Sequence, residues 1–235
     1  MSSLETLAAE PGEAALFLDV DGVLAPIVQR PEDARVPDET RRELARLARQ
    51  YGLVAAVTGR PSDVARRIVG VPELRYVGEH GLELEPASRR WRDQIHVLVT
   101  ESGWPDTELK SASAAFHYRT APDPDLARAE LEDVAAAALE QGLKTRWGRM
   151  VLEVLPPVEV TKGTAVRALL GESGLRRALY AGDDTTDLNG FDALDGLEVA
   201  VRVAVASPEG PSELATRADL VVASPAAFLE LLRNI

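Results

Sequence analysis

The sequence contains no cysteine, which excludes disulfide bonds, thiolate-bound zinc and a cysteine nucleophile. It also has no apolar run close to the roughly eighteen residues that a bilayer span requires, and its first residues show no basic start followed by an apolar stretch. We therefore expect a cytoplasmic protein without a membrane partner. The 235 residues, 46% of them hydrophobic, are enough for one domain or for one domain carrying a smaller inserted one.

Basic residues are scarce, with 26 Lys and Arg against 38 Asp and Glu and a formal net charge of -12 at pH 7. Binding to nucleic acid through counterion release needs a basic face, so we expect no nucleic-acid partner. The same excess of acids repels an anionic ligand at long range. If the ligand is a phosphate, local cations or a bound metal ion have to supply the attraction.

Short apolar segments alternate with segments of helical spacing over most of the chain. Near-continuous apolar runs predict strands buried on both faces, and this alternation predicts an α/β protein with a doubly wound, Rossmann-like parallel sheet. The predicted strands are 15–20, 53–57, 75–77, 178–181, 199–203 and 220–223. The predicted helices are 38–51 and 62–70, capped by Asp38 and Ser62, together with 163–170, 185–194 and 225–232.

The middle of the chain has a different pattern. Polar segments that contain tryptophan or tyrosine are followed by an alanine-rich helix and a strand that ends at two prolines. The predicted elements are strands at 91–100 and 110–118, a helix at 125–141 and a strand at 150–155. We therefore expect a small α+β domain, residues 83–157, inserted into a core formed by residues 1–82 and 158–235.

Two groups of acids come directly after predicted strands: Asp19 and Asp21, and then Asp183, Asp184 and Asp187. Ligands of an open α/β sheet bind beyond the carboxyl ends of its strands, so these carboxylates are expected at one edge. Like charges 4 Å apart repel by up to about 4 kcal/mol at an effective dielectric of 20, so the cluster requires a cation. Oxygen ligands and phosphate chemistry favour Mg²⁺ over zinc. The alternatives are an ordinary Asp-Gly turn and an acidic helix start.

Residues that could bind a phosphate also lie at the ends of predicted strands or at the starts of predicted helices. Thr58, Gly59 and Arg60 come after the predicted strand 53–57, and Lys162 begins a predicted helix. A hydroxyl, backbone amides and a cation are the donors that a phosphoryl group requires. A single lysine at a helix start is usually a solvated residue. The order of acid pair, threonine, lysine and acid cluster, each at a strand end or a helix start, favours one phosphate-transfer site.

This order of motifs resembles the haloacid dehalogenase superfamily of phosphatases, and within it the chain resembles the trehalose-6-phosphate phosphatases. The resemblance rests on the strings LFLDVDGVLAPI, VTGRP, VGEHGLE, ELK, FHYR, LEV, TKGTA and GDDTTD. Val23 stands where the family usually has threonine, and residues 186–189 replace a more acidic run. The resemblance implies a core with an inserted C2-type cap and Mg²⁺-dependent hydrolysis of trehalose 6-phosphate.

The resemblance also implies roles for the core residues. Asp19 would attack phosphorus and carry the aspartyl phosphate, and Asp21 would protonate the leaving sugar and then deprotonate water. Thr58 and Lys162 would bind the phosphoryl oxygens. Mg²⁺ would be held, directly or through water and hydrogen bonds, by Asp19, the backbone carbonyl of Asp21, Asp183, Asp184 and Asp187.

Further residues are expected to contact the substrate. The resemblance places the sugar-binding groups in the inserted domain, at Glu108, Lys110, Arg119 and Glu153, for which the alternative is a solvated sheet face. The residues expected at the mouth of the core site are Gly59, Arg60, Glu79 and His80. A purely structural His80 is an equal alternative.

Other functions stay open at this point. The same chemistry on sucrose phosphate or on a glycosyl phosphoglycerate is the nearest alternative, because the fold and the core motifs do not select the leaving group. A catalytically inactive regulator that binds a sugar phosphate would be expected to lack Asp19 or Asp21, and both are present. A nucleotide-binding module would need a glycine-rich phosphate loop, which the sequence does not contain. We expect a monomer that acts on a small sugar phosphate.

Overall fold

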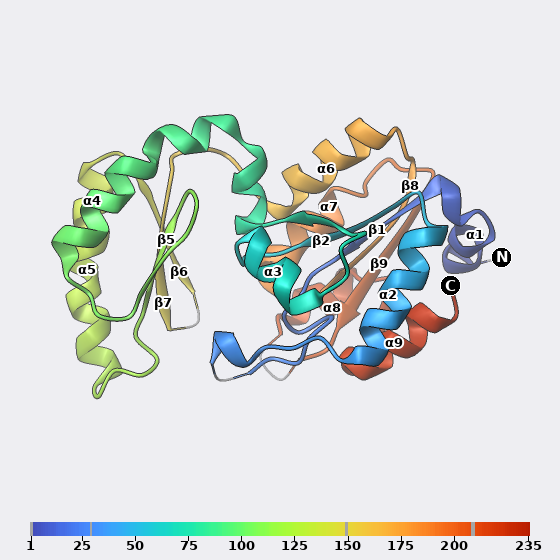
Figure 1. Ribbon diagram of the computed structural model, residues 1–235, viewed down its shortest axis with the longest axis horizontal. Helices are drawn as coiled ribbons and strands as arrows, with labels where there is room; N and C mark the ends of the chain where they lie inside the picture. The colour runs from blue at the N-terminus through green and yellow to red at the C-terminus, as the bar shows by residue number, and fades with distance from the viewer. Residues whose placement is uncertain (1, 29, 149, 208–209) are drawn as a thin grey trace. The chain divides into compact units, whose positions relative to one another are not determined.

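The computed structural model describes residues 2–28, 30–148, 150–207 and 210–235. The chain divides into two compact units, each with its own sheet. The core unit consists of the chain up to Gly81 together with Val160–Ile235, and the inserted unit is Leu82–Glu159 (Figure 1). Among the described residues, no helix is both long and apolar enough to cross a membrane.

The core unit contains a six-stranded sheet with the order β10-β9-β8-β1-β2-β3. Its strands are β1 (Ala14–Leu18), β2 (Leu53–Val57), β3 (Arg75–Val77), β8 (Arg177–Gly182), β9 (Val199–Val205) and β10 (Leu220–Val222). Every pairing between neighbours is parallel. The predicted α/β fold with a parallel sheet is therefore confirmed. The predicted bounds of β2 and β3 match the observed ones, and those of the other four strands differ by one or two residues at their ends.

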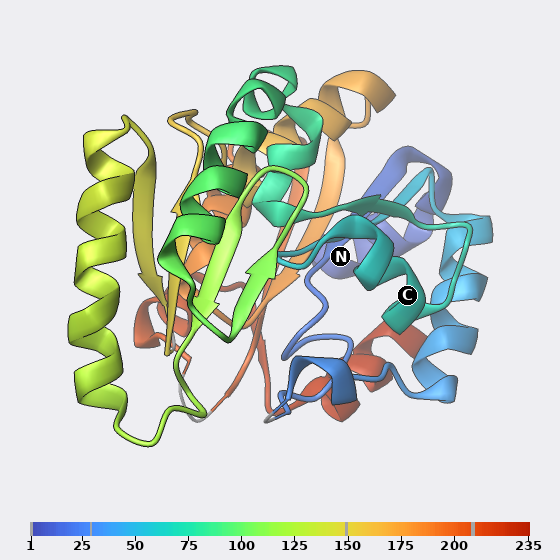
Figure 2. The same ribbon diagram turned by 60° about the vertical axis from the view of Figure 1, so that its left-hand side comes forward.

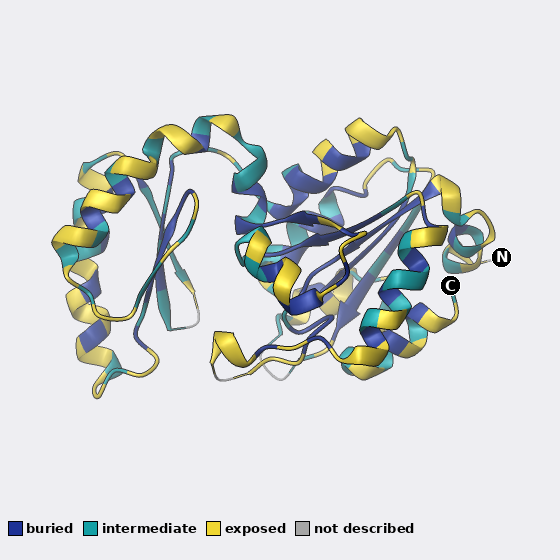
Figure 3. Cartoon of the chain, viewed as in Figure 1, coloured by how far each residue is buried: buried dark blue, intermediate teal, exposed yellow. Residues whose placement is uncertain are grey.

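Helices cover both faces of this sheet, and the alternation of side chains along β1 shows how. Leu16 and Leu18 belong to the core cluster that includes residues of α1, α2, α3 and α9, whereas Phe17 points to the other face. On that face α6 contacts β2 and α7 contacts β8. All five residues of β1 are buried, as an apolar run in a central parallel strand requires (Figure 3).

The helices of the core unit are α1 (Ser3–Ala9), α2 (Asp38–Gln50), α3 (Ser62–Val69), α6 (Lys162–Ser173), α7 (Leu188–Asp192), α8 (Ser212–Arg217) and α9 (Pro225–Arg233). Short 3-10 segments span Pro11–Glu13, Pro31–Asp33, Glu79–Leu84, Pro86–Trp91 and Thr185–Asp187. The predicted caps of α2 and α3 are wrong by one residue. Pro37 and Pro61 occupy the N-cap positions, so Asp38 and Ser62 lie in the first turns.

The inserted unit is a four-stranded antiparallel sheet with the order β4-β5-β7-β6. Its elements are α4 (Arg92–Ser102), β4 (Thr107–Leu109), β5 (Ala114–His117), α5 (Pro124–Glu140), β6 (Lys144–Gly148) and β7 (Val151–Leu155). Helices α4 and α5 pack against the sheet in a second core cluster that includes Phe116 and Leu152 (Figure 2). The strand predicted at 91–100 is wrong, because this segment forms α4, and β6 was not predicted.

Candidate active site

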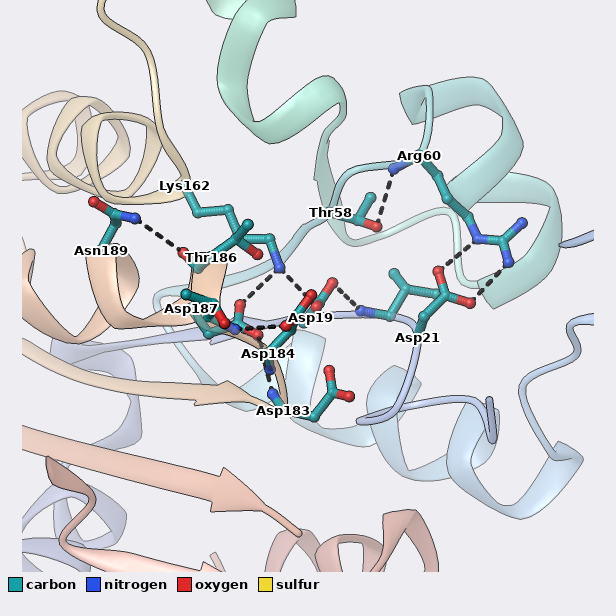
Figure 4. Close-up of polar contacts among 12 residues, drawn as sticks. Asp19, Asp21, Thr58, Arg60, Lys162, Asp183, Asp184, Thr186, Asp187 and Asn189 are labelled. Atoms are coloured by element: carbon teal, nitrogen blue, oxygen red, sulfur yellow. Dashed lines mark hydrogen bonds and ion pairs between the residues drawn. The ribbon is translucent and has the colours of Figure 1, made fainter. Parts of the chain in front are cut away.

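Three adjacent strands of the core sheet end at predicted functional residues. Asp19 follows β1, Thr58 follows β2 and Asp183 follows β8. The amide of Asp19 still donates to the carbonyl of Ala181 at 3.0 Å, so the backbone position of Asp19 is fixed by the parallel ladder itself. Parallel strands carry their carboxyl ends to one edge, and the three motifs therefore meet there (Figure 4).

Lys162 joins two of the acids. Its Nζ donates to Oδ2 of Asp19 at 2.6 Å and to Oδ1 of Asp187 at 2.7 Å. All three residues are buried. The lysine is the first residue of α6, and the Thr161 hydroxyl caps this helix by accepting from the amide of Thr164 at 3.2 Å. The local helix start thus holds the ammonium group against the acids.

The carboxylate of Asp187 accepts four hydrogen bonds. Its Oδ1 accepts from Lys162 and, at 2.7 Å, from the Tyr180 hydroxyl, while its Oδ2 accepts from the amides of Asp183 and Asp184 at 3.0 Å each. An ionised carboxylate offers about four lone-pair sites, so these bonds use its capacity. A Cβ at Gly182 would lie 2.3 Å from Asp187, so the close packing requires glycine there. Asp187 therefore orients the lysine and the turn that carries the other two acids.

Asp183 lies against the loop that follows Asp19. Gly22 in this loop has a φ of +78°, and a Cβ built on it would lie 2.2 Å from Oδ2 of Asp183. Only glycine accommodates both the left-handed backbone and the neighbouring carboxylate. Val23, where the family pattern has threonine, is completely buried in the core cluster. Its side chain contributes to packing, which accounts for an apolar residue at this position.

Burial and the opposite charge shift the pKa values of Asp19 and Lys162 in opposite directions, whereas burial and the neighbouring acids both raise the pKa of Tyr180. Burial raises the pKa of Asp19 well above its ordinary value, although Lys162 opposes the shift. Burial by itself would lower the pKa of Lys162, but Asp187 and Asp19 outweigh it and the pKa of the ammonium rises. Burial, followed by the charge of Asp187, raises the pKa of the Tyr180 hydroxyl. The tyrosine therefore stays protonated and donates to Asp187.

The buried acids fit a divalent cation. One carboxylate oxygen each from Asp19, Asp183 and Asp187 lies within 4.8 Å of the others. With all three ionised, one lysine leaves two negative charges, which a single divalent cation balances. Because Asp187 already accepts four hydrogen bonds, Asp19 and Asp183 are the better ligands. The fourth acid, Asp184, accepts from the amide of Thr185 and caps the following 3-10 turn.

Asp21 is held separately from this cluster. Arg60 forms a two-pronged contact with it, in which Nε lies 2.6 Å from Oδ2 and Nη2 lies 2.8 Å from Oδ1. The Thr58 hydroxyl accepts from the backbone amide of Arg60 at 3.3 Å. The structure thus brings the acid at position 21 together with the segment that follows β2 (Figure 4).

Glu79 and His80 pack against the same segment. The amide of Glu79 donates to the carbonyl of Arg60 at 3.0 Å, and the amide of His80 donates to the carbonyl of Thr58 at 2.9 Å. Both residues have positive φ, 50° and 55°, which is uncommon outside glycine and here is maintained by these bonds. The His80 imidazole lies against Gly59. All four residues expected at the mouth of the core site therefore belong to one small cluster.

Three of the four predicted residues of the inserted unit, Glu108, Lys110 and Glu153, lie on one face of its sheet. The pairing of β4, β5, β7 and β6 places Glu108, Ala115, Glu153 and Arg146 in one row across the four strands. Lys110 Nζ lies 3.5 Å from Oε1 of Glu153, and Arg146 Nε donates to Oε2 at 2.7 Å. The next row, with Phe116 and Leu152, faces the helices. Arg119 lies in the turn after β5.

Sequence reasoning missed two residues of these clusters. Tyr180 stands in an apolar strand and is indistinguishable there from a core aromatic residue. Arg146 stands in β6, and its pairing with Glu153 depends on the register between β6 and β7. An alternation of Lys144 and Arg146 with Thr145 and Trp147 is the one signal that predicts a charged strand face.

The core unit with its parallel sheet and the inserted unit with its antiparallel sheet together have the fold of haloacid dehalogenase-like proteins. A haloacid dehalogenase-like hydrolase from Bacteroides thetaiotaomicron has the same fold, with a TM-score of 0.64 at 15% identity over 94% of this chain and 98% of that one. A trehalose-6-phosphate phosphatase C-terminal domain from C. albicans superposes with a TM-score of 0.75 at 22% identity, over 99% of this chain and 95% of that one.

The sequence model of the trehalose-phosphatase family matches residues 17–107 and 106–226, and the chain belongs to this family. A probable trehalose-phosphate phosphatase from Sinorhizobium fredii is 31% identical over 88% of this chain and 84% of its own length. A trehalose-phosphate phosphatase from Mycobacterium avium is 33% identical over 94% of this chain but only 61% of its own length. These relatives confirm the resemblance inferred from the motifs.

Proposed function

We propose that this chain is a Mg²⁺-dependent phosphatase that hydrolyses trehalose 6-phosphate to trehalose and phosphate through a phosphorylated Asp19. The observation that carries this proposal is the buried contact of Asp19 with Lys162 beside Asp183, at the carboxyl edge of the core sheet. The family membership of the chain and the names of its relatives supply the substrate.

In the first step an oxygen of Asp19 forms a bond to phosphorus while the bond from phosphorus to the sugar oxygen breaks. Asp21 gives its proton to that oxygen, so that trehalose leaves as a neutral alcohol. Lys162 and the Thr58 hydroxyl donate hydrogen bonds to the transferring phosphoryl oxygens. Lys162 is already held in place by Asp187, so little reorganisation is needed when the phosphate arrives.

In the second step water attacks phosphorus and its proton passes to the carboxylate of Asp21. The bond from phosphorus to Asp19 breaks, phosphate leaves, and both acids return to their starting states. Asp19 and Asp183, with the backbone carbonyl of Asp21, would hold Mg²⁺, and Asp184 and Asp187 would support them from outside. The bound ion supplies charge neutralisation, which lets a dianion enter an acidic site.

We further propose that the inserted unit is the cap and that its charged sheet face binds the sugar. Hydroxyl groups suit the carboxylate of Glu153 and the ammonium of Lys110 through charge-assisted hydrogen bonds. Glu108 and Arg119 are proposed to take part in the same recognition. That the enzyme acts as a monomer, in the cytoplasm and without a nucleic-acid or membrane partner, stays a prediction from the sequence.

A phosphate-release screen tests the substrate. The purified chain with Mg²⁺ is assayed on trehalose 6-phosphate, sucrose 6-phosphate, glucosyl 3-phosphoglycerate and glucose 6-phosphate. We expect kcat/KM to be highest on trehalose 6-phosphate, by at least about tenfold, because a hydrogen-bonding sugar site discriminates strongly against altered hydroxyl patterns. A higher kcat/KM on another sugar phosphate would make that compound the proposed substrate in place of trehalose 6-phosphate. If none of the four compounds released phosphate, the proposed phosphatase activity would be contradicted.

A further inference from the structure

The contact between Arg60 and Asp21 is the most specific side-chain pairing at the core site that the reaction scheme leaves without a role. Nε and Nη2 of the guanidinium approach different oxygens of one carboxylate, at 2.6 and 2.8 Å. This is the two-pronged geometry that fixes the plane of a carboxylate as well as its position. The arginine side chain is 16% exposed and that of Asp21 is 37% exposed.

Arg60 is itself held in place from several directions. Its Nη1 donates to the carbonyl of Pro31 at 2.9 Å, in the long loop that follows the acid pair. Its backbone amide donates to Thr58, and its backbone carbonyl accepts from the amide of Glu79. A side chain anchored in this way is a rigid support rather than a mobile surface cation. Figure 4 shows the guanidinium on the far side of Asp21 from Asp19 and Lys162.

We propose that Arg60 is a positioning residue, which fixes the orientation of the Asp21 carboxyl group for proton transfer and does not itself bind the phosphoryl group. This inference rests on the proposed function, because it needs a reaction in which Asp21 protonates a leaving oxygen. It replaces the expectation that Arg60 contacts the substrate at the mouth of the site.

The chemistry of the pair supports this assignment. The two N–H groups of Arg60 use one lone pair on each oxygen of Asp21 and leave a second lone pair on each, one of which carries the proton that Asp21 transfers. When the bond from phosphorus to the sugar oxygen breaks, the proton of Asp21 passes to that oxygen, and the proton of the attacking water later returns to the carboxylate. Without the guanidinium the half-exposed carboxyl group rotates among several rotamers, and only a fraction of them reach the leaving oxygen.

The leaving group distinguishes positioning from phosphate binding. A sugar alkoxide is too basic to leave without a proton, whereas p-nitrophenolate leaves as a stable anion. A residue that acts through Asp21 therefore matters for trehalose 6-phosphate and little for p-nitrophenyl phosphate. A residue that binds the phosphoryl group matters equally for both, because both substrates carry the same phosphoryl group.

The experiment compares kcat/KM on these two substrates for the full-length wild type, Arg60→Ala, Arg60→Lys, Asp21→Asn and the Asp21→Asn/Arg60→Ala double variant. This parameter covers the steps up to phosphorylation of Asp19 and excludes the later hydrolysis. We expect Arg60→Ala to lose about 100-fold on trehalose 6-phosphate and less than about fivefold on p-nitrophenyl phosphate. We also expect Arg60→Ala to cost nothing further once Asp21 is Asn.

Arg60→Lys is expected to behave like the alanine variant on trehalose 6-phosphate, because a lysine cannot make the two-pronged contact. Arg60→Lys keeps the positive charge. If Arg60→Ala does not fold, Arg60→Lys takes its place in the test. The matched control is Arg35→Ala, since Arg35 donates to the carbonyls of Glu32 and Ala34 in the loop that Arg60 also contacts. We expect this control to keep its kcat/KM on both substrates.

Equal losses on the two substrates, or a further loss in the double variant, would overturn the inference and assign Arg60 to phosphate binding. The result is separable from the proposed function. If the wild type did not hydrolyse trehalose 6-phosphate, the proposed substrate would fail, and the comparison would be made with whichever sugar phosphate the wild type does hydrolyse.

Discussion

The ammonium nitrogen of Lys162 lies 2.6 Å from Oδ2 of Asp19, and both side chains are buried. The two residues are 143 positions apart in the chain, one at the end of the central strand and the other at the start of α6. Their contact depends on the parallel sheet, because only its carboxyl edge brings both element ends to one place. The fold therefore creates the site, and the inserted unit interrupts the sequence without interrupting this contact.

Asp19→Asn should abolish turnover. The amide keeps the shape of the side chain but has no carboxylate oxygen to attack phosphorus, so kcat should fall by at least about 10⁴-fold. Phosphate release from trehalose 6-phosphate measures the loss, and far-UV circular dichroism checks the fold. Asp63→Asn is the control, since Asp63 pairs with Arg67 on the surface and should leave activity unchanged. Appreciable activity in Asp19→Asn would contradict the proposal that Asp19 is the nucleophile.

Chelation should stop turnover, and Mg²⁺ should restore it. A readout without turnover is the melting temperature, because a cation that binds only the folded protein stabilises it by about 2.7 kcal/mol at a hundredfold excess over its Kd. We expect Mg²⁺ to raise the melting temperature of the wild type and to have much less effect on Asp183→Asn. Asp184→Asn should respond nearly as the wild type does. Equal shifts in all three proteins would place the ion elsewhere.

The sequence predicted the core strands closely, because they are short apolar runs, and β1, β2, β3 and β8 are followed directly by an acid, a hydroxyl or a glycine. It failed at α4, where Ile95, Val97 and Val99 alternate with polar or larger residues and imitate a strand. In the structure Ile95 and Leu98 are buried and Val97 is 53% exposed, which is the pattern of one helix face. Packing against the sheet of the inserted unit outweighed the preference of β-branched residues for strands.

The predicted residues of the core site came together, but their pairings were not predictable. That Asp21 contacts Arg60, 39 residues away, depends on the loop after β1 and on side-chain rotamers. The hydrogen bond from Tyr180 to Asp187 likewise depends on which face of β8 the tyrosine occupies. Motif order predicts which groups meet at the sheet edge, whereas the orientation of each group follows from three-dimensional packing.

Tyr180→Phe should lower activity as well as stability. It removes the donor to Asp187 and loosens the carboxylate that holds Lys162, so we expect kcat to fall by roughly tenfold with little change in KM. Loss of a buried hydrogen bond should cost about 1–3 kcal/mol of unfolding free energy. Tyr76→Phe is the matched control, because the Tyr76 hydroxyl is also buried but donates to the carbonyl of Val71. It should lose similar stability at unchanged kcat, and equal kcat in both variants would show that Tyr180 only stabilises the fold.

Glu153→Ala should weaken hydrolysis of trehalose 6-phosphate much more than that of p-nitrophenyl phosphate. Glu153 lies between Lys110 and Arg146 on the charged sheet face, and its removal leaves two cations without their shared acceptor. We expect kcat/KM on the sugar substrate to fall by about 10- to 100-fold, as for the loss of one or two charge-assisted hydrogen bonds. The aryl substrate has no sugar hydroxyls, so its rate should change by less than about threefold.

The control for Glu153 is Glu159→Ala in the same unit. Glu159 forms an ion pair with Lys144, and its side chain is 92% exposed, so its loss should leave both rates unchanged. Glu153→Gln refines the comparison, because it keeps the shape and one acceptor oxygen while it removes the charge. If the sugar rate falls only in the alanine variant, hydrogen bonding dominates recognition. An equal loss on both substrates in Glu153→Ala would argue that this face does not bind the sugar.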